Sequence, residues 1–393
     1  MKRFLGILFL AVTVAVSTGC SDWLHRNDPE KRMVLLYIAA TETSLSTFAE
    51  GNISDMLANY VPDKKSKTEE LLVFFQNRNT SATTLRSQGT LCRYYKNKSG
   101  NIIQETITTF GDDFNACDPA SFAKVLAAAE HECKPTYRSL LFSSHGTGWL
   151  PASYFDGGGE SSIKRASIGY DAYTKDEIDI RDFAEVLGKY HWEAALLDCC
   201  YMGAVEVAYQ LRNCCDWIIA SPTEILITGF PYNVILDQLF NHPGREGLEY
   251  ICEQYYNMYQ SQSGTQQSGT IGLVDCSKLD ALANICATIV SESRAEMEAV
   301  QRNGVQHFFY NSTKDYFYDL SHFYQKFATT DRFAQFSIQL EKAVPYKNTT
   351  DHFLGIKMQH FCGLSTYVPS PNYPKLNEYY SQLAWNQAVK VIE

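Results

Sequence analysis

The sequence lacks several features that would assign a protein of this size to a class. It has no cysteine pair in CxxC spacing and no CxxC/HxxxH array, which argues against a structural zinc site. It has no surplus of basic residues, since 34 Lys and Arg face 44 Asp and Glu, and the formal charge of −10 argues against a nucleic-acid partner. It has no internal repeat and no long low-complexity linker. The 393 residues can therefore bury a large core as one big domain or two smaller ones.

Cysteine is not scarce, but its spacing is irregular. The chain has 12 cysteines, and eleven of them follow Cys20. A disulfide scaffold is usually a much smaller chain with dense, regular cysteine spacing, so we do not expect one here. Four cysteines stand in apolar stretches and are predicted to be buried as small hydrophobic residues: Cys252, Cys276, Cys286 and Cys362.

The apolar run at the N-terminus is too short for a membrane-spanning helix, which needs about 20 residues. Lys2 and Arg3 precede the apolar residues 4–16, and small residues lead into Cys20. This order is typical of an export signal. Removing residues 1–20 takes away two basic residues and no acids, so the formal charge moves from −10 to −12.

The end of this signal resembles a bacterial lipobox, although Ser17 stands where that motif usually has Leu. The resemblance implies cleavage before Cys20 and acylation of its thiol, which would anchor the protein in the bacterial cell envelope, facing the periplasm or the outside. The alternative is an ordinary secretory signal with an incidental cysteine. Residues 21–31 are mostly polar and are predicted to be a short tether.

Beyond the tether, short apolar runs alternate with helical patterns, which predicts a mostly parallel sheet in an α/β fold. The predicted strands are Val34–Ala39, Leu71–Gln76, Ser139–Phe142, Ala194–Leu197 and Trp217–Ala220. The predicted helices are Asn52–Tyr60, Pro119–Ala129, Ile178–Tyr190 and Gly203–Leu211. A hairpin of Leu91–Lys96 and Asn101–Thr108 interrupts the alternation. Farther on, Thr270–Val274 reads as a strand and Ser277–Ser291 as a helix.

Two polar motifs follow two of these strands. His145 comes after the strand that ends at Phe142, and Cys200 comes after the strand that ends at Leu197. In an open parallel sheet, reactive groups gather beyond the carboxyl ends of the strands. A thiol nucleophile needs a base such as histidine within reach. The spacing therefore predicts a cysteine hydrolase with Cys200 as nucleophile and His145 as base.

Cys199 competes with Cys200 for the role of nucleophile. Side chains alternate along a strand, so Asp198 and Cys200 should point to one side and Cys199 to the other. The helix expected from Gly203 would favour a thiolate at Cys200 through its N-terminus, as would an imidazole. The backbone N–H groups of Gly146 and Cys200 could form an oxyanion hole.

Together the motifs resemble those of the clostripain-like cysteine peptidases. The resemblance rests on two motifs, His-Gly-x-Gly-Trp starting at His145 and Asp-x-Cys-x-Met-Gly starting at Asp198. Glu206 follows three residues after Gly203, the last residue of the second motif. Other stretches are similar to the family as well: Met33–Ala40, Ala220–Glu224, Gly229–Tyr232, Tyr318–Leu320 and Cys362–Pro369. The resemblance implies a caspase-like fold with helices on both faces of the sheet. It also implies the dyad of caspases, legumain and gingipains, with Cys200 as the second residue after Asp198.

The resemblance further implies an endopeptidase that cleaves protein or peptide substrates after Arg or Lys. Asp198 would select the basic P1 side chain in the S1 pocket, although it could instead cap the following helix, and Glu224 is a candidate for the pocket rim. Relatives often cut themselves between the two motifs, where Lys164 and Arg165 follow a glycine-rich run. No cofactor is expected from the residues, and the resemblance alone allows calcium. The alternative function is a catalytically silent surface lipoprotein that binds peptide or glycan.

These expectations divide the chain into four parts. Residues 1–20 are a lipoprotein signal peptide, and 21–31 are the tether. Residues 32–265 form the caspase-like catalytic domain, and 266–393 form a C-terminal α+β subdomain packed on it. The division after residue 265 rests on the change of pattern there.

Overall fold

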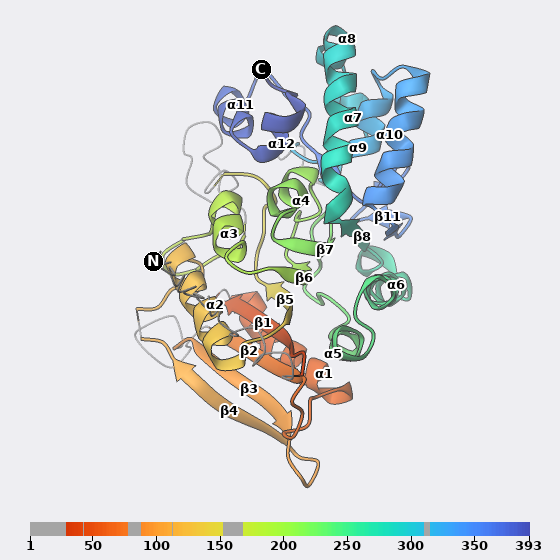
Figure 1. Cartoon of the computed structure of the whole chain (residues 1–393). Helices are drawn as coiled ribbons and strands as arrows, with labels where there is room; N and C mark the ends of the chain where they lie inside the picture. Colours follow the sequence, from red (N-terminus) through yellow and green to blue (C-terminus); the bar gives the residue numbers. More distant parts are fainter. Residues whose placement is uncertain (1–28, 42, 78–87, 112, 152–167, 310–314) are drawn as a thin grey trace, which may run out of the picture.

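The computed structural model describes residues 29–41, 43–77, 88–111, 113–151, 168–309 and 315–393. Cys20, Lys164 and Arg165 lie outside these residues, as does the glycine-rich run before Lys164. A nine-stranded sheet forms the centre of the molecule, in the order β10-β8-β7-β6-β5-β1-β2-β3-β4 (Figure 1). Its strands are β1 (Arg32–Ala40), β2 (Glu69–Asn77), β3 (Thr90–Lys96), β4 (Ile102–Thr109), β5 (Tyr137–Ser143), β6 (Trp192–Asp198), β7 (Cys215–Ala220), β8 (Thr270–Asp275) and β10 (Tyr346–Thr349).

The middle five strands, β7-β6-β5-β1-β2, are parallel, and they are the five short apolar runs predicted from the sequence. Both faces of these strands are covered, because residues on β1 alternate between two hydrophobic cores. Leu35 and Tyr37 belong to one core, whereas Leu36 and Ile38 belong to the other. The predicted hairpin is β3–β4, and its antiparallel pairing with β2 extends one edge. The predicted fold class is confirmed.

Helices cover the two faces of the sheet (Figure 1). The helices are α1 (Thr43–Asn59), α2 (Pro119–Cys133), α3 (Ile180–Leu187), α4 (Val205–Leu211), α5 (Tyr232–Asn241), α6 (Arg245–Gln260), α7 (Leu279–Glu292), α8 (Arg294–Glu298), α9 (Leu320–Gln325), α10 (Thr330–Ala343), α11 (Pro374–Ser381) and α12 (Ala384–Val389). Residues of α1, α5 and α6 pack in one core, and those of α2, α3 and α4 pack in the other. The Asp118 side chain caps α2, which has Pro119 at its first turn, as the sequence predicts.

Four helix starts differ from the sequence-based expectation. α1 begins at Thr43, nine residues before the predicted start at Asn52. Helix propensity does not predict the longer helix, because Gly51 lies inside it and glycine costs about 1 kcal/mol in a helix interior. Packing overrides this cost, since Ala49, Ile53 and Met56 are buried on the helix face that meets the core. The other three helices each begin two residues later than predicted: α3 at Ile180, α4 at Val205 and α7 at Leu279.

The C-terminal part of the chain continues the same sheet. β8 pairs antiparallel with β7, and β10 pairs antiparallel with β8. Two short strands, β9 (Tyr318–Asp319) and β13 (Ser365–Thr366), pair beside it, and β11 (His352–Phe353) pairs with β12 (Ile356–Lys357). The aromatic residues between Phe308 and Phe327 that the structure describes are buried. The division after residue 265 stays a prediction, and residues on both of its sides build one sheet.

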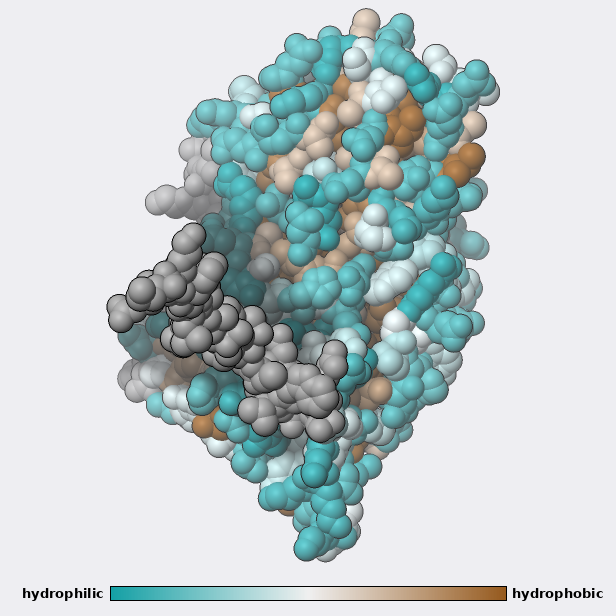
Figure 2. All heavy atoms as spheres, viewed as in Figure 1, coloured by the Kyte–Doolittle hydropathy of each residue, from teal (hydrophilic) through white to brown (hydrophobic). Residues whose placement is uncertain are grey.

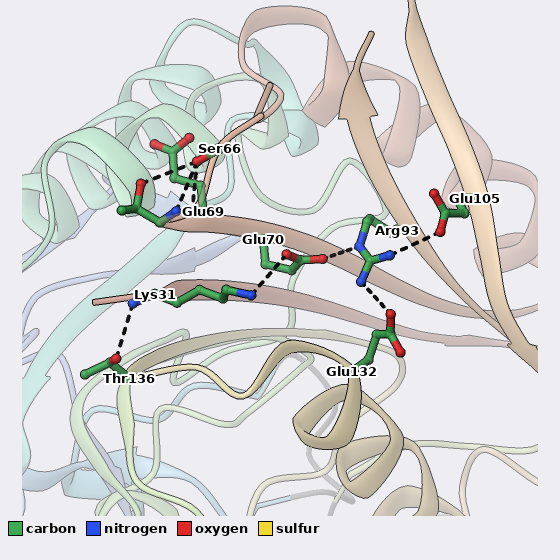
Figure 3. Close-up of polar contacts among 9 residues, drawn as sticks. Lys31, Ser66, Glu69, Glu70, Arg93, Glu105, Glu132 and Thr136 are labelled. Atoms are coloured by element: carbon green, nitrogen blue, oxygen red, sulfur yellow. Dashed lines mark hydrogen bonds and ion pairs between the residues drawn. The ribbon is translucent and has the colours of Figure 1, made fainter. Parts of the chain in front are cut away.

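Charged side chains hold the β3–β4 edge to its neighbours (Figure 3). Arg93 on β3 pairs with Glu70 on β2, with Glu105 on β4 at 3.2 Å and with Glu132 on α2 at 2.7 Å. Lys31 approaches Glu70 at 3.9 Å. One guanidinium with several donors can join three elements in this way. The cluster is at the edge that carries the hairpin, three strands from the pair β5–β6.

The face of the molecule seen in Figure 2 is largely hydrophilic, and its apolar residues form small separate patches. Among the described residues, no helix has both the length and the apolar character needed to cross a membrane.

Candidate active site

The two expected catalytic residues follow neighbouring parallel strands at one edge of the sheet. Ser143 at the end of β5 is aligned with Asp198 at the end of β6, and His145 and Cys200 each stand two residues farther on. Paired strands are about 4.8 Å apart, so this register brings the two residues to the same place. Both line a cleft of about 510 Å³.

The backbones of the two strand ends meet at Gly146. A Cβ atom on Gly146 would lie 2.7 Å from the carbonyl oxygen of Cys200 and 2.8 Å from the Cβ of Cys199. Only glycine allows this approach. Within the described part of the chain, the N–H groups of Gly146 and Cys200 donate no hydrogen bond to another residue. Two backbone donors that are close together and have no partner in another described residue could bind a developing oxyanion.

The sulfur of Cys200 contacts the loop that follows β7. The Ile225 N–H donates to Sγ at 3.3 Å, and the thiol lies 3.8 Å from the Ile225 carbonyl oxygen. Burial and, to a smaller extent, the negative charge of Glu224 raise the pKa of the Cys200 thiol to about 12, while the Ile225 N–H opposes the shift. In this conformation the thiol is protonated at neutral pH. A base must therefore take its proton before or during attack.

Cys199 points away from this loop and into the core. Its thiol donates to the Phe142 carbonyl oxygen at 3.7 Å, and the side chain belongs to the core that α2, α3 and α4 cover. Burial raises the pKa of Cys199 well above its ordinary value. All eleven cysteines of the described residues are free thiols, and ten of them are buried, whereas Cys200 is partly exposed. The strand alternation predicted this opposite placement of Cys199 and Cys200.

The loop after Cys200 is held in an unusual conformation. Tyr201 has φ +62°, which costs a non-glycine residue about 1–2 kcal/mol. Its ring stacks on Phe317 with centroids 4.4 Å apart, and its N–H donates to the Thr223 carbonyl oxygen at 2.8 Å. These contacts offset the cost and fix the direction in which Cys200 leaves the strand.

The His145 ring packs edge to face with Tyr170, and both residues line the cleft.

Asp198 is buried at the cleft, with its carboxylate held by hydroxyl and backbone donors. The Tyr232 hydroxyl donates to Oδ2 at 2.5 Å, and a Cβ on Gly229 would lie 2.7 Å from the same oxygen. Burial raises the pKa of Asp198 from 3.8 to about 6, and hydrogen bonds from Tyr232, Phe230 and Ser143 oppose this shift. Near neutral pH the carboxylate is ionised, and none of the described residues that line the cleft is a lysine or an arginine.

Two alternatives considered from the sequence are wrong. Asp198 does not cap the next helix, because the N-cap of α4 is Ala204 and no side chain hydrogen-bonds there. The helix expected to favour a thiolate at Cys200 does not start at Gly203, since α4 begins five residues after Cys200, and the N–H group that contacts the sulfur is that of Ile225. The reason is tertiary: the tight Tyr201 turn separates the strand from the helix.

Glu224 lines the cleft beside the nucleophile, as the sequence suggested. It is partly exposed, and the Tyr201 hydroxyl donates to its Oε1 at 3.1 Å. Sequence reasoning did not assign a role to Tyr232 or Tyr170, nor to the residues of α1 that line the cleft. The motif Gly229–Tyr232 was the available signal for Tyr232, whereas nothing in the sequence of α1 linked it to the site.

Comparison with known proteins identifies the family of this chain. The sequence profile of the clostripain family matches residues 36–355, which is most of the chain. The chain belongs to the clostripain family. The solved structure of an inactive zymogen C11 protease from Parabacteroides distasonis is similar, with 28% identity and a TM-score of 0.77 over 92% of this chain and 98% of that one. This clostripain-family chain is therefore a cysteine-type peptidase.

Two further similar structures are secreted C11 cysteine proteases from Bacteroides thetaiotaomicron. One, solved with an irreversible peptide inhibitor, has 27% identity and a TM-score of 0.75 over 91% of this chain and 98% of its own. The other, iotapain, has 25% identity and a TM-score of 0.77 over 92% and 99%. None of the curated protein sequences matches this clostripain-family chain significantly. Within the described ranges, no group of three or more His, Cys, Asp or Glu side chains is placed to hold a metal ion.

Substituting Gly146 by Ala should disable the site. The new methyl group would push against the Cys200 carbonyl and the Cys199 side chain, so the two strand ends must separate. We expect kcat to fall about 10²-fold or more, the scale for a displaced oxyanion-hole donor, and stability to fall by about 1–3 kcal/mol. Peptide hydrolysis and thermal unfolding measure the two effects. Gly304→Ala is the matched control, because nothing lies within 4 Å of a Cβ there; equal effects in both variants would contradict the argument.

Proposed function

We propose that the protein is an exported, lipid-anchored endopeptidase that cleaves after Arg or Lys through the dyad of His145 and Cys200. The observation that carries this proposal is the cleft at the ends of β5 and β6. A thiol, an imidazole and a buried carboxylate line it together. The family supplies the reaction class, and the arrangement of the three groups supplies the roles.

The catalytic cycle follows from the state of each group. His145 takes the Cys200 proton as the sulfur attacks the scissile carbonyl, because the thiol does not ionise unaided at neutral pH. The N–H groups of Gly146 and Cys200 bind the oxyanion, and the protonated imidazole then gives its proton to the leaving amine. Water, deprotonated by His145, hydrolyses the thioester and restores the thiol.

Asp198 is the proposed selector of the P1 residue. Its ionised carboxylate lies at a cleft that no described lysine or arginine lines, and a guanidinium or ammonium group of the substrate would form a charge-assisted pair with it. Glu224 would add a second negative charge at the rim.

A peptide panel tests the proposal. Peptides that differ only at P1 should be hydrolysed with Arg or Lys at least 10²-fold faster, in kcat/KM, than with the neutral analogue Gln. His145→Ala should abolish hydrolysis of all of them. Equal rates for Arg, Lys and Gln would refute the assignment of Asp198. Tight binding of peptides without any hydrolysis would favour the silent surface lipoprotein instead.

The lipid anchor is a proposal from Cys20 and the signal before it. Cells given a labelled fatty acid should incorporate it into the wild type, and Cys20→Ala should lose the label. An unlabelled wild-type protein would eliminate the anchor and leave the peptidase assignment standing.

Self-processing at Lys164 or Arg165 is a separate proposal. These basic residues fit the P1 preference that Asp198 would impose, so one site could cut its own chain. Purified wild type should yield two fragments divided there, whereas Cys200→Ala stays intact. An active wild type that remains a single chain by mass spectrometry would exclude this form of activation.

A further inference from the structure

The catalytic cleft has an apolar wall beside its acidic groups. The acidic groups are Asp198 and Glu224, described above, and Glu177. The apolar wall comes from α1 and from the loop between β7 and α5, and its members are Leu45, Phe48, Ala49, Ile225, Leu226 and Ile227. The two segments lie far apart in the sequence, and only the fold brings them together.

The wall includes apolar side chains that remain exposed. Six large hydrophobic residues in the described part of the chain are exposed, and two of them, Phe48 at 43% and Ile227 at 40%, line this cleft. Single exposed apolar residues need no explanation, but several that gather at a pocket mark a binding surface.

The wall is preformed. On the core side of α1, Ile53 and Met56 are buried, and the Asn59 side chain donates to the Asn233 carbonyl oxygen on α5 at 2.6 Å. The helix therefore presents Phe48 to the cleft from a fixed position. A rigid apolar surface binds a side chain with little cost in ordering.

The wall is continuous with the catalytic groups. Ile225 donates its N–H to the Cys200 sulfur, and Gly229, in the same loop, lies against the Asp198 carboxylate. A peptide whose basic residue reaches Asp198 while its carbonyl meets Cys200 must pass this loop. The occupant of the wall is therefore part of the substrate itself.

We infer that the wall of α1 and the β7–α5 loop is a subsite for an apolar side chain that neighbours the basic P1 residue. This inference rests on the proposed function and narrows its substrate class. The substrates are then chains in which an aliphatic or aromatic residue stands close to Arg or Lys. An acidic or small polar residue at that position would leave Phe48 and Ile227 in water.

The test measures peptide binding to the Cys200→Ala protein, so that it does not depend on turnover. Each peptide carries one Arg, and each of the three positions before it and the two after it is either Leu or Ser. At one of these positions we expect Leu to bind about tenfold more tightly than Ser, which corresponds to about 1.4 kcal/mol. Adding Phe48→Gln and Ile227→Ser should reduce this ratio to about twofold.

Two matched variants control for general effects. Ile338→Gln removes an exposed apolar side chain from α10, which does not line the cleft, and should leave the ratio unchanged. Phe48→Leu keeps an apolar side chain and should retain most of the ratio. The inference is overturned if no position prefers Leu, or if the preference survives loss of both Phe48 and Ile227.

The same peptides with Gln in place of Arg separate the two proposals. If peptides with Gln bind as tightly as peptides with Arg and still prefer Leu, the basic P1 assignment is wrong and the apolar subsite stands. A strong requirement for Arg without any Leu preference would do the reverse.

Discussion

Cys200→Ala should lower peptide hydrolysis by about 10⁵-fold or more, whereas Cys199→Ala should leave kcat/KM within about threefold of wild type. The expected loss for Cys200→Ala is of the size measured when other hydrolases lose their nucleophile. The two residues are neighbours in sequence, but only Cys200 is partly exposed, and Cys199 donates to a carbonyl in the core. Removing Cys199 should therefore cost stability, by about 1 kcal/mol for a small buried side chain, and not activity.

Alkylation of the native protein checks the same assignment independently of any substrate. Among the cysteines in the described part of the chain, iodoacetamide should modify Cys200 first, and fragment spectra should place the label on residue 200. Because the Glu224 charge raises the pKa of Cys200, Glu224→Gln should shift the alkylation profile to lower pH. Label on Cys199, or hydrolysis that persists in Cys200→Ala, would show that the nucleophile has been assigned incorrectly.

Asp198→Asn should abolish the preference for Arg and Lys and, at the same time, stabilise the fold. Removing one partner of a buried charge pair costs about 2–5 kcal/mol, so kcat/KM for basic substrates should fall about 10²–10³-fold. Hydrolysis of a neutral P1 substrate should change little. For wild type, kcat/KM with Arg at P1 should decline as pH falls through about 6, since the carboxyl group becomes protonated.

Ionisation of Asp198 lowers the stability of the folded state, whereas ionisation of an ordinary ion-paired carboxylate raises it. Burial raises the pKa of Asp198 from 3.8 to about 6, so the folded state holds a proton that the unfolded state releases between these pH values. Stability is therefore lost as pH rises from about 4 to about 6, by up to about 3 kcal/mol. Asn carries no charge at any of these pH values. The free energy of unfolding of Asp198→Asn should therefore equal that of wild type below pH 4 and exceed it at pH 7 by most of this amount.

Denaturant unfolding at pH 4 and pH 7 measures this difference. Tyr232→Phe is the matched control, because it keeps the carboxylate and removes the hydroxyl that donates to it at 2.5 Å. That hydrogen bond lowers the pKa of Asp198, so its loss should move the decline in activity on basic substrates to higher pH. If Asp198→Asn is equally stable to wild type at both pH values, the carboxylate is not buried as described.

Much of the site could be predicted from the sequence, because its main residues stand directly after two strands that the local sequence pattern identifies. A parallel strand with both faces covered is a short apolar run, so β5 and β6 stood out, and the residues directly after them could be placed at one sheet edge. The alternation of side chains then separated Cys200 from Cys199. The Asp118 cap and Pro119 fixed the start of α2 in the same way.

The rest depended on contacts between distant segments. The sequence did not reveal the first half of α1, because Gly51 lowers the local propensity that burial of Ala49 and Ile53 restores. It also did not reveal the Ile225 donor at the nucleophile, since the turn at Tyr201 is stabilised by Phe317 and Thr223, which no local pattern predicts.

The sequence by itself determined the class of the sheet, the two strand ends that carry histidine and cysteine, and the family. Each of these is set by residues within one strand and its next few positions. Only the tertiary structure decided that Asp198 is buried beside Tyr232, that Ile225 contacts the Cys200 sulfur and that α1 walls the cleft. A pKa and a pocket wall arise from what surrounds a group in space, and neighbours from other elements supply those surroundings.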